Sequence, residues 1–119
     1  MINDKTKHKF DLEERTARFG ENVLIFCKNI RLNSINESLI KQLIRSSTSV
    51  GANYMEANGS DSRKDFKNKI SICKKESKET THWLRMLSVV LPEYKEKLRN
   101  LWKKAQEFVL IFSSIVKKV

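Results

Sequence analysis

Apolar or small residues recur at alternating steps of four and three along most of the chain, and this spacing most constrains how it can fold. The longest run consists of Phe66, Ile70, Cys73, Ser77, Thr80, Leu84, Leu87 and Leu91. Steps of four and three place side chains on one face of an α-helix, whereas a half-buried strand needs alternation at every second residue. The sequence therefore predicts a long amphipathic helix here.

Three other segments carry the same spacing. The runs are Leu12, Thr16, Phe19, Val23, Phe26 and Ile30 within 11–31; Leu39, Leu43, Ser47, Val50 and Tyr54 within 35–57; and Tyr94, Leu98, Leu101, Ala105, Phe108, Phe112, Ile115 and Val119 within 92–119. Four such helices joined by short turns predict an all-α fold, an antiparallel up-and-down four-helix bundle over 11–119. Residues 1–10 are polar and basic without a period, and we expect a flexible basic arm there.

Short polar motifs predict where the helices begin and end. Asp11, Ser34 and Ser62 are each followed three positions later by an acidic residue, which is typical of a helix N-terminus. Gly59, after Asn58, predicts a left-handed residue that ends the second helix. Pro92 cannot continue the third helix but suits the first turn of the fourth.

Basic residues outnumber acidic ones, with a formal net charge of +10 and an isoelectric point of about 9.8. The excess lies in the second half, where residues 62–90 carry a net charge of +5 and residues 91–119 a net charge of +4. Such a balance suits nucleic acid, an anionic membrane surface or an acidic protein, or serves solubility alone. Our candidate phosphate-binding side chains, expected to face solvent, are Lys64, Lys67, Lys74, Lys75 and Lys78, with Lys103 and Lys104 as a second group.

A polar line interrupts the second helix. Its members are Arg45, Ser46, Ser49, Asn53 and Glu56, and small residues around them would let a neighbouring backbone come close. The line could be structural, hydrogen-bonded within and between helices, or it could contact a ligand or RNA. We favour the structural interpretation because a buried charge needs a partner, and Glu56 is a candidate partner for Arg45.

No catalytic or metal motif is evident. Cys27 and Cys73 lie in or beside the apolar runs, which indicates buried core thiols. Glu79 and His82 form a single E-x-x-H, whereas a di-iron bundle needs two of them and further inward carboxylates. We therefore expect no enzymatic activity, metal or cofactor. With no secretory signal and no apolar run long enough to span a bilayer, we expect a cytoplasmic protein that does not enter membranes.

The last helix carries more apolar residues than one buried face needs, including Val109, Leu110 and Val116. A monomer seldom exposes a contiguous apolar patch of this kind. The sequence therefore predicts self-association.

Three motifs together resemble a known family. They are Arg45, Ser46, Ser49, Asn53 and Glu56 in R-S-x-x-S-x-x-x-N-x-x-E; Lys64, Asp65 and Phe66 opening the next helix; and Glu76, Glu79, Trp83 and Leu84 in E-x-x-E-x-x-x-W-L. This combination, within a match over about residues 10–115, resembles the four-helix-bundle proteins encoded in 23S ribosomal RNA intervening sequences. That family includes the accessory variability determinant of diversity-generating retroelements. Here Ala57-Asn58 replaces the glycine that usually follows the glutamate of the first motif.

The resemblance implies a homopentameric ring of bundles with no known enzymatic activity and a suspected nucleic-acid or ribonucleoprotein role. A reverse transcriptase is a candidate partner by the same resemblance. Two hypotheses remain: a basic oligomeric protein that binds RNA or DNA through phosphate contacts, or a structural or protein-interaction bundle whose charge serves solubility only. The steep loss of nucleic-acid affinity with rising salt would distinguish them.

Overall fold

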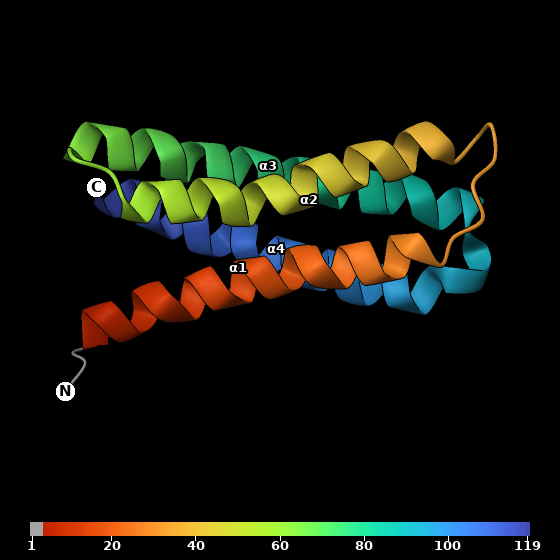
Figure 1. Cartoon of the computed structure of the whole chain (residues 1–119), viewed down its shortest axis with the longest axis horizontal. Coiled ribbons are helices and arrows are strands. Elements are labelled where there is room, and N and C mark those ends of the chain that lie inside the picture. Colours follow the sequence, from red (N-terminus) through yellow and green to blue (C-terminus); the bar gives the residue numbers. More distant parts are fainter. Residues whose placement is uncertain (1–3) are drawn as a thin grey trace.

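The protein is an antiparallel bundle of four helices. The computed structural model describes the backbone of residues 4–119 and the side chains from residue 11 on. The elements are α1 (Asp4–Lys28), α2 (Glu37–Asn58), α3 (Arg63–Val90), the 3-10 turn η1 (Pro92–Tyr94) and α4 (Lys95–Lys118). They run up and down along a body of 46 × 28 × 19 Å (Figure 1). The predicted fold class is confirmed.

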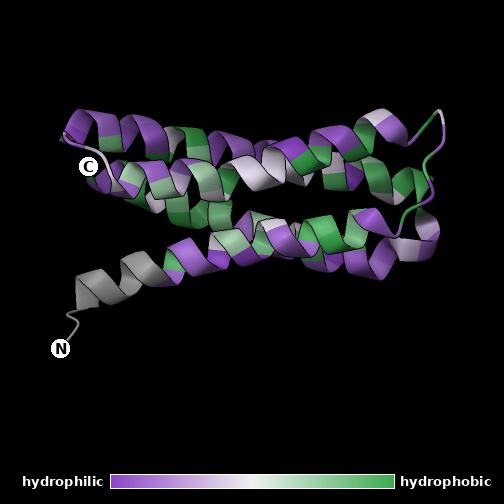
Figure 2. Ribbon diagram, in the orientation of Figure 1, coloured by the Kyte–Doolittle hydropathy of each residue, from purple (hydrophilic) through white to green (hydrophobic). Residues whose placement is uncertain are grey.

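The core consists of the faces that the four-three spacing selects. Hydrophobic residues line the sides of the helices that meet each other, and hydrophilic ones cover much of the outside (Figure 2). Val23, Leu43, Ile70 and Leu98 from the four helices are all buried in one cluster. The backbones of the helix pairs α1–α2, α2–α3 and α3–α4 come close along much of their length, whereas α1 and α4 stand further apart and meet through side chains such as Phe19 and Phe108, whose ring centroids are 5.5 Å apart.

The helices α1 and α2 come close together at two glycines. A Cβ added at Gly51 would lie 3.4 Å from the backbone of Thr16 and Ala17 on α1. A Cβ at Gly20 would lie 3.6 Å from the Cα of Thr48 on α2. The small residues of α2 thus allow the close approach that the sequence predicted, and the neighbouring backbone is that of α1.

Several helix ends differ from their predicted positions. The first helix begins at Asp4 instead of Asp11, since no glycine or proline precedes Gly20 to stop it extending upstream. The predicted arm therefore falls partly on this helix, and its residues 1–3 lie outside the described part. The second helix begins at Glu37, with Asn36 instead of Ser34 at the N-cap position.

The turn between α1 and α2 is held by two asparagines. Asn33 Oδ1 accepts bonds of 2.9 Å from the backbone N–H groups of Ile35 and Asn36. Asn36 Oδ1 in turn accepts a 3.0 Å bond from the Asn33 N–H. These local bonds compete with the predicted Ser34 cap and delay the start of the helix.

The remaining predicted ends give a mixed result. Ser62 caps α3 as predicted, accepting a 3.1 Å bond from the Asp65 N–H, and Pro92 begins the turn that leads into α4. Gly59 does not adopt the left-handed conformation, because its φ is −93° and its N–H bonds back to the Glu56 carbonyl at 3.1 Å. Within the described residues, no helix is both long enough and apolar enough to cross a membrane.

Candidate nucleic-acid interface

A polar network joins the middle of α2 to the middle of α3. Arg45 donates to Glu76 across 3.0 Å and also pairs with Glu79, while its Nε donates to Gln42 at 2.9 Å. The indole N–H of Trp83 donates to Glu79 Oε1 at 3.1 Å. The side chain of Glu76 is only 12% exposed, so the Arg45 guanidinium supplies the partner that a nearly buried carboxylate needs.

Two hydroxyls extend this network inward. The Oγ atoms of Ser46 and Thr80 lie 2.8 Å apart in a fully buried hydrogen bond between α2 and α3. Thr80 Oγ1 also lies 2.8 Å from the Glu76 carbonyl oxygen. The first and third sequence motifs thus meet in space and join α3 to α2 through an ion pair and hydrogen bonds.

The hydrogen bonds of Ser49 and Asn53, two further members of the polar line, lie within α2. Ser49 donates to the Arg45 carbonyl at 2.6 Å, and the Asn53 amide donates to the Ser49 carbonyl at 2.8 Å. Glu56 accepts a 2.6 Å bond from Lys69 on α3, so the predicted pairing of Glu56 with Arg45 is wrong. Three turns of helix separate those two residues, whereas α3 brings Glu76 and Glu79 directly beside Arg45.

Two of the three carboxylates of α3, those of Glu76 and Glu79, pair with Arg45 of α2, and the third, Asp65, is exposed in the first turn. This leaves a row of lysines on α3 without a salt-bridge partner. Within residues 11–119, no carboxylate lies in salt-bridge range of Lys64, Lys67, Lys75 or Lys78, all of which are exposed. Lys74 is half-buried, contrary to the prediction that it faces solvent, because it lies beside the core position Cys73. We refer to Lys64, Lys67, Lys74, Lys75 and Lys78 as the α3 lysine row.

The second group of candidates lies on α4. Lys103 and Lys104 are both exposed. Lys104 pairs with Glu107 at 3.2 Å, and Glu107 also accepts from Arg15 on α1 at 3.5 Å. This group is therefore partly neutralised, whereas the α3 lysine row is not.

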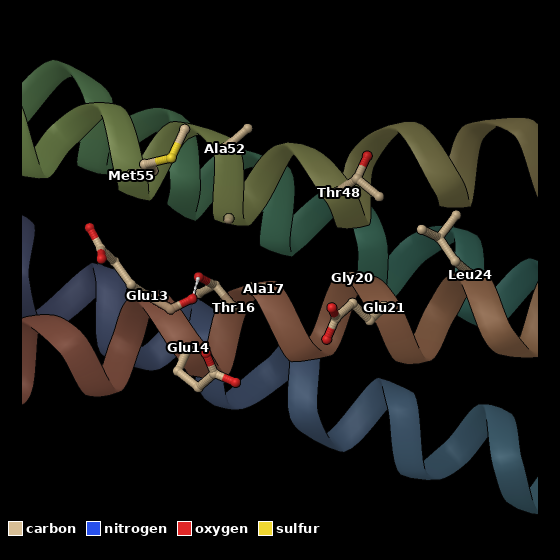
Figure 3. Close-up of a pocket in the computed structure, with 11 residues that line it drawn as sticks. Glu13, Glu14, Thr16, Ala17, Gly20, Glu21, Leu24, Thr48, Ala52 and Met55 are labelled. Carbon is tan, nitrogen blue, oxygen red and sulfur yellow. Dashed lines mark hydrogen bonds between the residues drawn. The ribbon is translucent and has the colours of Figure 1, made fainter.

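A groove of about 710 Å³ lies between α1 and α2, on the side of the molecule away from the α3 lysine row (Figure 3). Thr48, Ala52 and Met55 contribute from α2, across from Glu13 and Gly20 on α1 (Figure 3). The carboxylates of Glu13, Glu14 and Glu21 line it. An acidic lining repels phosphate, so this face is unsuited to nucleic acid and the basic side of α3 and α4 is the candidate interface.

The structure also assembles a set of residues that sequence reasoning did not single out. Arg85 of α3 and Lys95, Arg99 and Trp102 of α4 line a groove of about 340 Å³ near the η1 turn. The signal on α4 was present in the sequence, because steps of four and three from 95 to 99 to 102 place these three side chains on one face of the helix. Only the packing of α3 against α4 brings Arg85 to the same place.

The two cysteines are core thiols, as predicted. Both are buried, and Cys73 Sγ lies 3.6 Å from the Val50 carbonyl oxygen. Burial raises the pKa of Cys27 to about 11 and that of Cys73 to about 12. A thiol with so high a pKa is a poor nucleophile at neutral pH. Glu79 of the E-x-x-H is bound to Arg45 and Trp83.

An all-α bundle with an internal ionic network between its second and third helices, and with one basic side, defines the class of this protein. The family model of the 23S rRNA-intervening sequence proteins matches residues 8–114, and the chain belongs to that family. The resemblance carried by the three sequence motifs is thereby confirmed.

A solved structure is closely similar. It is the crystal structure of a protein of unknown function from the S23 ribosomal protein family of Bacteroides thetaiotaomicron. The two share 31% sequence identity and a TM-score of 0.77, over 88% of this chain and 97% of that one. No curated protein gives a significant match.

Proposed function

We propose that this protein is a non-enzymatic, oligomeric accessory factor that binds nucleic acid through the phosphate backbone. The nucleic acid we propose is RNA. The family relation supports an association with RNA, since the family takes its name from the intervening sequences of 23S ribosomal RNA. The α3 lysine row would supply the main contacts and Lys103 a further one. Contacts of this kind hold a strand in place without reading its sequence.

The observation that carries the proposal is the separation of charge on α3. Its inward carboxylates, Glu76 and Glu79, are occupied by Arg45 of α2, while the outward lysines have no acidic partner in the described part of the chain. Lys64 to Lys78 covers about 21 Å of helix at about 1.5 Å per residue, enough to follow several phosphates of a strand. A charge that served solubility alone would not require this sorting of carboxylates from lysines.

Self-association would strengthen such a surface. Leu110 on α4 is 63% exposed, and Val109 and Val116 on the same helix are half-buried, so this helix keeps apolar surface that a second copy could cover. A ring of subunits, a pentamer by analogy with the family, repeats the basic face and raises avidity without any new contact. The competing hypothesis, a bundle whose charge serves solubility only, predicts no such binding.

The test is a charge reversal confined to exposed lysines. In a Lys64→Glu, Lys67→Glu, Lys78→Glu variant we expect unchanged helix content and oligomer mass, with at least about tenfold weaker binding to single-stranded RNA at low salt. The matched control reverses Arg18, Lys28 and Lys41 on α1 and α2, which gives the same net charge on the other side. Equal loss in both variants, or no binding by the unmodified protein at low salt, would favour the solubility hypothesis.

A further inference from the structure

The groove between the end of α3 and the start of α4 combines an aromatic side chain with unpaired cations. Trp102 is 39% exposed although it is one of the largest apolar side chains in the chain. Within residues 11–119, no carboxylate lies in salt-bridge range of Arg85, Lys95 or Arg99. Of the other arginines in the same range, Arg15, Arg18 and Arg45 each pair with a glutamate, whereas Arg31 and Arg63 do not. This groove therefore offers its guanidinium groups to an anion from outside.

The floor of the groove is rigid. It is formed by Leu84 and Leu98, each only 1% exposed in the core between α3 and α4. Ser88 lies on the rim, and its hydroxyl donates to the Arg85 carbonyl at 2.6 Å. A site of about 340 Å³ on a packed floor is at the small end of preformed ligand sites, a size that suits one nucleotide better than a larger ligand.

The groove lies at the end of the α3 lysine row. Lys64, Lys67, Lys74, Lys78 and Arg85 follow one another at steps of three, seven, four and seven along α3. These steps keep side chains on one face of a helix. A strand whose phosphates follow the row is therefore led to Arg85 and to the indole of Trp102.

We propose that this groove holds an unstacked base of single-stranded nucleic acid against Trp102, with the adjoining phosphate between Arg85 and Arg99. The inference rests on the proposed nucleic-acid binding and adds that the bound nucleic acid is single-stranded. An aromatic face accepts any base by stacking, and a guanidinium binds phosphate through two parallel hydrogen bonds. The bases of a duplex are already stacked on one another, so a duplex can reach the lysine row but cannot fill the groove.

The first experiment follows tryptophan fluorescence while a short single-stranded RNA, or the duplex of the same sequence, is added to the full chain at low salt. We expect the single strand to quench the emission and the duplex to leave it nearly unchanged. Trp102→Phe should keep a stacking face and remain folded but lose the quench, since the remaining Trp83 donates to Glu79 inside the network. Quenching that persists in Trp102→Phe would overturn the proposal.

The second experiment compares affinities by fluorescence anisotropy with labelled strands. Trp102→Ala should weaken single-strand binding about 5- to 150-fold, the range for loss of one stacked base, and leave duplex binding unchanged. Arg85→Gln with Arg99→Gln should weaken single-strand binding more than duplex binding while keeping the aromatic ring. The matched control, Arg18→Gln with Arg31→Gln, removes two arginines from the α1 side and should leave the preference for single strands intact.

The outcomes separate this inference from the proposed function. If single strand and duplex bind equally and neither groove variant changes this, the inference fails while phosphate binding by the α3 lysine row stands. If the unmodified protein binds neither strand at low salt, both fail. If Trp102→Ala loses helix content, Trp102→Phe and the double arginine variant decide the question.

Discussion

At the scale of single residues, Arg45 is the most connected polar side chain in the described structure. It contacts Gln42 on its own helix and two glutamates on α3, one of which is nearly buried. The side chain of Arg45 is itself 46% exposed, so solvent screens part of the attraction. The main effect of Arg45 is therefore to satisfy Glu76, whose carboxylate would otherwise lose its partner.

Replacing Arg45 alone should cost more stability than replacing the pair. We expect Arg45→Met to lower the free energy of unfolding by about 1–3 kcal/mol, because it leaves Glu76 without its partner. Arg45→Met combined with Glu76→Leu should recover part of that loss, since no buried charge remains. Urea unfolding of the two single variants and the double variant measures this coupling, and additive costs would show that the two residues do not interact.

The two core thiols give the stability a dependence on alkaline pH. Burial holds the folded pKa of Cys27 at about 11 and that of Cys73 at about 12, above the ordinary value of 9.0. As the pH rises past 9, the unfolded chain releases thiol protons that the folded chain keeps, so the free energy of unfolding falls. Below pH 8 the thiols are protonated in both states and contribute no slope.

Urea unfolding between pH 8 and 11 should therefore show a steeper fall for the unmodified protein than for a Cys27→Ala, Cys73→Ala variant. Tyr54, whose pKa burial also raises, acts in the same direction and is present in both proteins. Equal slopes would mean that the thiols ionise as readily in the fold as in the unfolded chain.

At the scale of helices, the sequence was most informative where it repeats. The four-three spacing selected faces whose central residues are buried. Val50, Leu84 and Phe108, for example, are each at most 1% exposed. Helix ends were less predictable, because local side-chain bonds such as that of Asn33 to the Asn36 N–H compete with the caps. The helices still form where the spacing predicts, because burying a whole helix face stabilises the fold more than any single cap does.

Which residues meet across two helices could not be predicted. No carboxylate of α2 lies within reach of Arg45, and which carboxylates of α3 come beside it depends on how far α3 slides along α2. The Trp102 groove has the same origin, since Arg85 and Arg99 approach each other only through the pairing of α3 with α4. Spacing within a helix specifies a face, but it does not specify the register between faces.

Two leucines that α3 and α4 contribute to the core test this pairing. Leu84 and Leu98 are each 1% exposed, so Leu84→Ala or Leu98→Ala should cost about 2–5 kcal/mol of unfolding free energy. Val89→Ala on α3 is the matched control, because Val89 is 73% exposed and its truncation should cost less than about 0.5 kcal/mol. Costs near zero at both leucines would mean that the assigned core faces are wrong.

At the scale of the whole molecule, charge divides the bundle into two sides. The groove between α1 and α2 is lined by three glutamates, whereas α3 and α4 carry the unpaired cations. Under the proposed function, we expect an anionic strand approaching from solution to be turned toward α3 and α4 before any contact forms, and this orientation to weaken as salt screens the field.

The wide spacing of the α1 and α4 backbones has a consequence for how the molecule opens. Because the backbone of α1 comes close to α2 only, and α1 meets α4 through side chains such as Phe19 against Phe108, α1 can detach with less loss of contact than α3, which packs closely against two helices. We expect amide hydrogens in α1 to exchange with solvent fastest and those of α3 slowest, in a native-state exchange experiment under mild denaturant. Opening of this kind would expose Phe19 and Val23 while the ionic network between α2 and α3 stays closed, so the helices that carry the basic surface would outlast the one that carries most of the acidic groove.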